Sequence, residues 1–141
     1  TSLVETCAGD GAIVAYHASF ERSCIEGLVQ AVPALRNELR RIQARIVDLE
    51  PMVTNHLYHP GFKGSFSLKV VLPTLCPEVT YDELTIADGS TAQLELARLL
   101  YGERPIPEAE RLELRRALLD YCKLDTWAMV LLHKKLRELA G

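Results

Sequence analysis

The sequence predicts an α/β domain in which helices outnumber strands. Two short β-branched apolar runs, "GAIVAY" at 11–16 and "RIVDLEPMV" at 45–53, are typical of buried strands. Between and after them, apolar residues recur at helical spacing, and the last such segment runs from 107 to about 139. With 141 residues, of which 48% are hydrophobic and 25% charged, the chain fits one globular domain with a core of its own.

The first strand is followed by a predicted helix. Its apolar positions are Phe20, Cys24, Ile25, Leu28 and Val32. Ser19 is the candidate N-cap, which puts Glu21 in the first turn. Pro33 is expected to break this helix, and "PALRNELRRIQAR" to resume one before the second strand, which Pro51 limits.

The second half of the chain predicts three helices joined by loops. "TNHLYHPGFKGSF" at 54–66 is typical of a loop, and Ser67 and Ser90 are candidate N-caps for the helices that follow. Pro73 is expected to cut the first of these helices, and the second is expected to run through about Tyr101. The third, from Pro107 to about Leu139, is long enough to suggest a bend near Asp125.

Composition limits the partners and the cellular compartment to be expected. The net charge of −3 gives no overall field that attracts nucleic acid, so a nucleic-acid role needs a local basic patch or bound cations. No apolar run approaches the roughly 18 residues that span a bilayer, and the N-terminus does not resemble a signal peptide. None of the four cysteines forms a C-x-x-C pair, and Cys24 and Cys122 are expected to be buried thiols. We therefore expect a reduced, cytoplasmic protein with no membrane partner.

Two stretches carry recognisable motifs. "VAYHASFERSCIEGL" at 14–28 runs from strand into helix, and "YCKLDT" at 121–126 lies in the last helix. Their order and context resemble the DEDD family of 3′–5′ exonucleases in the ribonuclease H-like superfamily. Phrases such as "HPGFKGSFSLKVVLP" and "YDELTIADG" extend the resemblance over most of the chain, to an uncharacterised bacterial domain of that superfamily.

The resemblance implies functional roles for individual residues. In the family the strand-to-helix junction reads Asn-x-x-Phe-Asp and the late helix reads Tyr-x-x-x-Asp. Here His17 stands where the Asn is usual, Phe20 matches, and Glu21 replaces the Asp, while Tyr121 and Asp125 match. The resemblance implies that Glu21 and Asp125 are metal ligands, that Tyr121 orients the attacking water, and that His17 is a supporting hydrogen-bond donor.

The chemistry explains the need for carboxylates. Cleavage of a phosphodiester places charge on the attacking and leaving oxygens, and two divalent cations can stabilise both. Mg²⁺ or Mn²⁺ takes oxygen ligands. The family's first motif, Asp-x-Glu, is not found before "GAIVAY", so we expect it upstream of Thr1. Residues 1–141 would then be a single C-terminal fragment of an incomplete ribonuclease H-like fold, with weak or no metal binding and no activity alone.

Several residues keep two interpretations. Glu21 could be a carboxylate that is stabilised by the helix dipole and does not bind a metal. Asp48 could face the site or begin the turn before Pro51. Trp127 is assigned to the core or to a partner contact.

Lys63, Ser65, Ser67 and Lys69 could contact a nucleic-acid backbone, since a helix start can hold phosphate, or could form a capped surface loop. The alternative to a nuclease is a non-catalytic ribonuclease H-like module for nucleic-acid binding or assembly. A truncated sheet also predicts a homodimer through its exposed edge.

Overall fold

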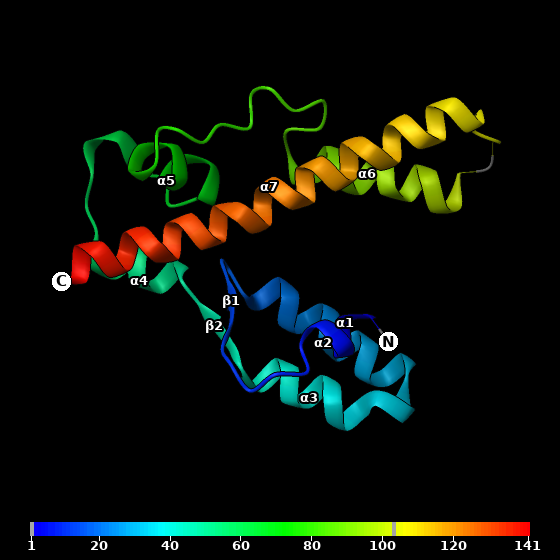
Figure 1. Ribbon diagram of the computed structural model, residues 1–141, viewed down its shortest axis with the longest axis horizontal. Coiled ribbons are helices and arrows are strands. Elements are labelled where there is room, and N and C mark those ends of the chain that lie inside the picture. Colours follow the sequence, from blue (N-terminus) through cyan, green and yellow to red (C-terminus); the bar gives the residue numbers. More distant parts are fainter. Residues whose placement is uncertain (1, 103) are drawn as a thin grey trace. The chain divides into compact units, whose positions relative to one another are not determined.

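Two short strands, β1 (Ile13–Ala15) and β2 (Ile46–Asp48), pair in parallel in a computed structural model of the chain (Figure 1). Ile13 lies opposite Ile46, and Ala15 lies opposite Asp48. The structure describes residues 2–102 and 104–141, which fall into two compact units, Thr1–Leu68 and Lys69–Gly141. The helix-rich α/β class with a small sheet is confirmed.

In the first unit, helices connect the two parallel strands. A parallel pair needs a crossover, and α2 (Ser19–Ala31), the 3₁₀ turn η1 (Pro33–Leu35) and α3 (Arg36–Ala44) provide it. As predicted, the first helix ends just before Pro33; this proline begins η1, and α3 follows at Arg36. The short α1 (Ser2–Thr6) packs on α3. One core cluster of this unit consists of Ala15, Ala18, Ile25, Val29, Leu39, Ile42 and Ile46.

The predicted apolar face of α2 is only partly buried. Ile25 and Val29 lie in the core, whereas Phe20 is 59% exposed and Cys24 is also exposed. The reason is that α2 has a second apolar stripe, Phe20, Cys24 and Leu28, spaced at i, i+4 and i+8. The expectation of a buried thiol at Cys24 is therefore wrong.

After β2 the chain enters a helix that the sequence did not predict, α4 (Glu50–His56). Pro51, taken as the limit of a strand, stands in the first turn of α4, where its missing N–H costs nothing. A 3₁₀ turn, η2 (Pro60–Phe62), follows in the glycine-rich segment.

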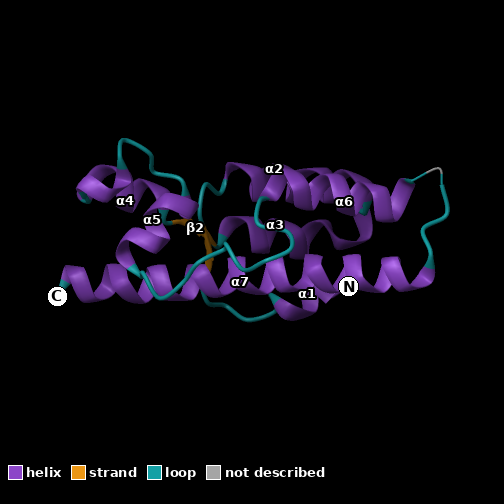
Figure 2. Cartoon of the chain, turned by 90° about the horizontal axis from the view of Figure 1, so that it is seen from above, coloured by secondary structure: helices purple, strands orange, loops and turns teal. Residues whose placement is uncertain are grey.

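The second unit contains α6 (Gly89–Tyr101), α7 (Glu108–Ala140) and all but the first residue of α5 (Leu68–Leu75). α6 packs along the N-terminal half of α7, and the two views in Figures 1 and 2 agree on this pairing. Val71 and Leu72 of α5 and Ala128 and Leu132 of α7 are fully buried. α7 is assigned as one uninterrupted helix of 33 residues.

Three local expectations in this unit are wrong. Pro73 lies inside α5 without ending it, and the Thr74 hydroxyl donates to the Val70 carbonyl across it (2.7 Å). The N-cap of α6 is Asp88 rather than Ser90. Cys122 is exposed because it lies on a flank of α7 away from the buried face. All four cysteines of the chain are free thiols.

Candidate functional site

The turn between β1 and α2 is held by one carboxylate. Asp48, the last residue of β2, accepts hydrogen bonds from the backbone N–H groups of His17 and Ala18, both at 2.9 Å. It also accepts the Glu50 N–H at 3.0 Å. One side chain therefore fastens both strand-to-helix junctions, which lie at the carboxyl ends of the two strands.

These bonds bear on two expectations from the sequence, the start of α2 and the role of Asp48. Asp48 holds the backbone of His17 and Ala18 just before α2, and Ser19 is the first residue of that helix, not its N-cap. Its bond to the Glu50 N–H also starts α4, which confirms that Asp48 begins the turn before Pro51. With three N–H partners, this carboxylate has a structural task, and it supports the backbone next to Glu21.

His17 adopts a left-handed backbone conformation, with φ of 61°. Such a conformation is uncommon for a residue with a Cβ, and the bond from its N–H to Asp48 holds it in place. Its side-chain Nδ1 lies 2.6 Å from Glu50 Oε2. That hydrogen bond is the main reason why the pKa of His17 is raised, and the charges of Glu50, Asp48 and Glu21 act in the same direction.

Glu21 lies in the first turn of α2 and is exposed. Asp48 accepts the N–H groups of His17 and Ala18, the two residues just before this helix. The negative charge of the Glu21 carboxylate contributes to the raised pKa of His17. The next residue, Arg22, donates to the Ile46 carbonyl (3.0 Å) and ties α2 to β2.

Tyr16 connects the junction to the loop at 60–66. Its hydroxyl donates to the Phe66 carbonyl at 2.5 Å. Burial, followed by the charges of Glu50 and Asp48, raises the pKa of Tyr16 to about 12. Tyr16 was not predicted as a functional residue, because its partner lies 50 residues away and no local spacing reveals it.

The residues predicted to contact nucleic acid are divided between the units. In the first, Lys63 is exposed with φ of 49°, and the Ser67 N–H lies 3.4 Å from Ser65 Oγ. In the second, Lys69 donates to the Ala87 carbonyl at 2.8 Å and lies 6.0 Å from the centre of the Tyr81 ring. The Lys69 ammonium is therefore engaged within its own unit.

Asp125 and Tyr121 lie one turn apart on α7, and both are half-buried. The hydroxyl of Tyr81 donates to Asp125 Oδ1 at 3.0 Å. The Tyr81 ring also lies against the Tyr121 ring, with 6.4 Å between their centres. The structure therefore adds Tyr81 to the predicted pair, from a segment 44 residues earlier.

Burial is the first cause of the raised pKa of both phenols, Tyr81 and Tyr121. The negative charge of Asp125 adds to it in each case. Both hydroxyls therefore stay protonated at neutral pH and can act as donors beside the Asp125 carboxylate. An aromatic wall with one carboxylate is suited to holding a cation or orienting a water molecule.

The metal-ligand requirement is not met by the described residues alone. Within residues 2–102 and 104–141, no three His, Cys, Asp or Glu side chains gather closely enough to hold a metal ion. Glu21 belongs to the first unit and Asp125 to the second. Each predicted ligand therefore offers a single carboxylate within its unit, fewer oxygen ligands than Mg²⁺ requires.

Comparison with known families gives one match. Residues 1–67 match the model described as a domain of unknown function, DUF2779. The match covers the first unit, including β1, Glu21 and the Asp48 junction, and ends one residue before that unit does. No curated protein and no solved structure matches the chain.

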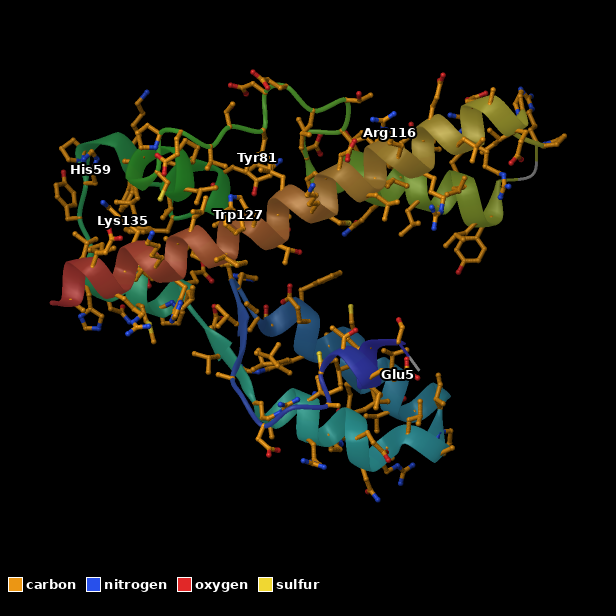
Figure 3. All side chains as sticks on the ribbon, in the orientation of Figure 1. Glu5, His59, Tyr81, Arg116, Trp127 and Lys135 are labelled. Atoms are coloured by element: carbon orange, nitrogen blue, oxygen red, sulfur yellow. The ribbon has the colours of Figure 1, made fainter. Side chains whose placement is uncertain are left out.

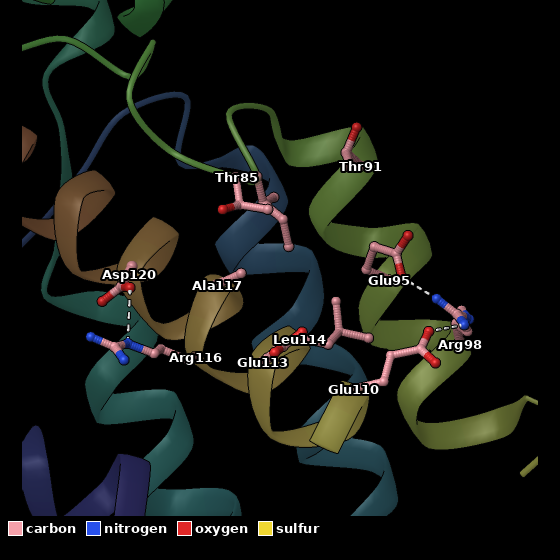
Figure 4. Close-up of a pocket in the computed structure, with 11 residues that line it drawn as sticks. Thr85, Thr91, Glu95, Arg98, Glu110, Glu113, Leu114, Arg116, Ala117 and Asp120 are labelled. Atoms are coloured by element: carbon pink, nitrogen blue, oxygen red, sulfur yellow. Dashed lines mark hydrogen bonds and ion pairs between the residues drawn. The ribbon is translucent and has the colours of Figure 1, made fainter. Parts of the chain in front are cut away.

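A separate cleft of about 530 Å³ lies between α6, α7 and residues 85–86 (Figure 4). Its two arginines are paired with acids: Arg98 with Glu95 and Glu110, and Arg116 with Asp120 at 4.0 Å. Glu113 adds a further carboxylate. The lining is therefore acidic on balance, which does not suit a phosphate ligand. None of the described helices is both long and apolar enough to cross a membrane.

Proposed function

We propose that this chain is part of a metal-dependent 3′–5′ exonuclease-like nuclease domain with a ribonuclease H-like fold. The observation that carries the proposal is the junction after β1. A partly buried strand runs into a helix whose first turn carries Glu21, and this is the context in which the DEDD exonucleases carry their second motif. Tyr121 and Asp125 supply the late Tyr-x-x-x-Asp pattern on α7.

In this proposal Glu21 and Asp125 are two of four carboxylate ligands, and Asp-x-Glu in upstream sequence provides the others. Bound Mg²⁺ or Mn²⁺ would stabilise charge on the attacking and leaving oxygens of the phosphodiester. The residues of this chain hold the ligands: Asp48 fixes the backbone before Glu21, and Tyr81 orients Asp125. Tyr121 is placed one turn from Asp125, where its hydroxyl can orient a water molecule.

Degradation of single-stranded DNA in Mn²⁺ by a protein extended upstream tests the proposal. We expect Asp125→Ala to abolish it, and Asp120→Ala, an exposed acid on the same helix, to leave it unchanged. Tyr121→Phe should lower kcat and leave KM nearly unchanged, because it removes only the hydroxyl that orients the water molecule. Activity of Asp125→Ala equal to that of the unmodified protein would refute the assignment.

The second candidate is a non-catalytic module that kept the fold for nucleic-acid binding or assembly. The lack of a three-ligand cluster among the described residues favours it over an active fragment. Upstream sequence without Asp-x-Glu in an apolar strand, together with no metal-dependent degradation, would support this candidate. A homodimer through the strand edges stays a prediction, which a monomer on gel filtration would contradict.

A further inference from the structure

The exposed face of α7 combines positive charge with apolar side chains. Helical geometry of about 100° per residue puts Leu112, Leu119 and Val130 on one line, opposite the buried Ala128 and Leu132. The cations on the same face, within about 60° of that line, are Arg115, Arg116, Lys123, Lys134 and Arg137. We call these five the α7 cations. All are exposed.

The carboxylates of α7 avoid this face. Of its six, only Glu108 falls on it, at the first residue of the helix, and it is paired with Arg111. Among the described residues, Arg116 is the only α7 cation with an acid within 4.0 Å, namely Asp120 at 4.0 Å. An ordinary solvated helix face interleaves opposite charges at i, i+4. On α7, Asp120 and Glu138 stand four residues after Arg116 and Lys134, whereas Arg115 and Arg137 have no acid three or four residues away.

The helix dipole explains only part of the pattern. Cations in the last turns, such as Lys134 and Arg137, are stabilised by the negative end of a helix. Arg115, Arg116 and Lys123 lie in the N-terminal half, where the dipole gives no such benefit. The dipole leaves the cations of the N-terminal half unexplained, and an external anion could pair with them. The exposed face extends for about 37 Å from Leu112 to Arg137, at 1.5 Å per residue.

Trp127 indicates which anion fits. It is the only tryptophan of the chain, it is 53% exposed, and Figure 3 labels it on α7. Along the helix it lies between Lys123 and Lys134. It was expected in the core or at a partner contact, and its exposure excludes the core. An exposed aromatic ring among spaced cations is suited to binding single-stranded nucleic acid, because bases stack on the ring while phosphates pair with the cations.

We propose that the exposed face of α7 binds single-stranded nucleic acid without sequence preference. Phosphates are contacted by the four α7 cations without an acid partner, namely Arg115, Lys123, Lys134 and Arg137, and Trp127 stacks on a base. This inference deepens the proposed function by assigning a surface to its substrate class. It differs from the predicted contacts at Lys63, Ser65, Ser67 and Lys69, of which Lys69 is already bonded within its unit. Binding needs no metal, so it can succeed or fail independently of hydrolysis.

The test uses the 141-residue chain, a fluorescein-labelled oligo(dT) of 20 nucleotides, and EDTA. We expect oligonucleotide anisotropy to rise and Trp127 fluorescence to be quenched in parallel. Affinity should fall with salt, with a log–log slope of about −0.7 for each phosphate contact. Arg115→Gln with Lys123→Gln should weaken binding about tenfold at 50 mM salt and reduce the slope by about 1.4.

The matched control is Arg36→Gln with Arg41→Gln, which removes two exposed cations of α3 and gives the same net charge. It should leave the affinity unchanged within about twofold. Circular dichroism checks that both variants fold. The inference is overturned if the control weakens binding as much as the α7 variant, if Trp127 is not quenched, or if no binding occurs at low salt. A Trp127 blue shift on anionic phosphatidylglycerol vesicles, without oligonucleotide binding, would overturn it in favour of a membrane surface.

Discussion

At the scale of single residues, two side chains determine the geometry of the proposed ligands. Asp48 holds the turn before Glu21, and Tyr81 holds Asp125. Neither contact could be predicted from local spacing, because the partners are 31 and 44 residues apart. Sequence patterns reveal neighbours on one helix face, as for Tyr121 and Asp125, but not side chains that meet through tertiary packing.

Asp48→Ala removes the acceptor of three backbone N–H groups. Because such bonds to a charged cap are worth more than neutral ones, we expect the free energy of unfolding to fall by about 2–4 kcal/mol. Asp10→Ala, which removes one exposed ion pair with Arg41, should change it by less than about 0.5 kcal/mol. Urea denaturation measures both, and equal effects would contradict the role of Asp48.

Tyr81→Phe removes the donor to Asp125 while keeping the buried ring. We expect a loss of about 1–2 kcal/mol in the free energy of unfolding, since one hydrogen bond to a carboxylate is lost. Tyr121→Phe is the matched control, because no hydrogen bond of its hydroxyl is found among the described residues, and it should cost less than about 0.5 kcal/mol. A larger loss in the control would show that Tyr81 does not hold Asp125.

The pair formed by His17 and Glu50 should make stability depend on pH. Because folding raises the pKa of His17, the stabilisation is full below the unfolded pKa of about 6.5 and is lost as pH rises through the folded pKa. Glu50→Gln should therefore lower the melting temperature more at pH 6 than at pH 8. An equal effect of Glu50→Gln at both pH values would argue against the pair.

At the scale of elements, hydrophobic periodicity predicted most helices and both strands. It failed where a local rule competed with it. Pro51 was read as the limit of a strand although proline also favours a first helical turn, so α4 was missed. Ser90 was predicted as the cap of α6, whereas the N-cap is Asp88, whose carboxylate accepts both the N–H and the hydroxyl of Thr91. Periodicity alone also could not tell which apolar stripe of α2 is buried.

The two faces of α7 should respond differently to truncation of leucine. Leu132 is fully buried and Leu119 is 54% exposed. We expect Leu132→Ala to lower the free energy of unfolding by about 2–5 kcal/mol, because it leaves a cavity. Leu119→Ala should change it by less than about 0.5 kcal/mol. Denaturant unfolding of both variants measures the difference, and similar losses would mean that the buried face of α7 is assigned wrongly.

At the scale of the whole molecule, the sequence predicted the helix-rich α/β class, while the likeness to exonucleases remains a proposal. The predicted ligands Glu21 and Asp125 lie in different units of the described chain, and a helical pattern cannot tell whether two such units share one site. The family match stops with the first unit, so it carries the Glu21 junction but not Asp125. The claim to test is therefore that each of these two carboxylates contributes to metal binding.

Isothermal titration of Mn²⁺ into a protein extended upstream tests this claim most directly. The account predicts binding that Glu21→Ala and Asp125→Ala each weaken at least tenfold, about 1.4 kcal/mol, because each removes one carboxylate ligand. Asp120→Ala should leave the affinity unchanged. Absence of Mn²⁺ binding by the extended protein, or an unchanged affinity after either ligand substitution, would contradict the account.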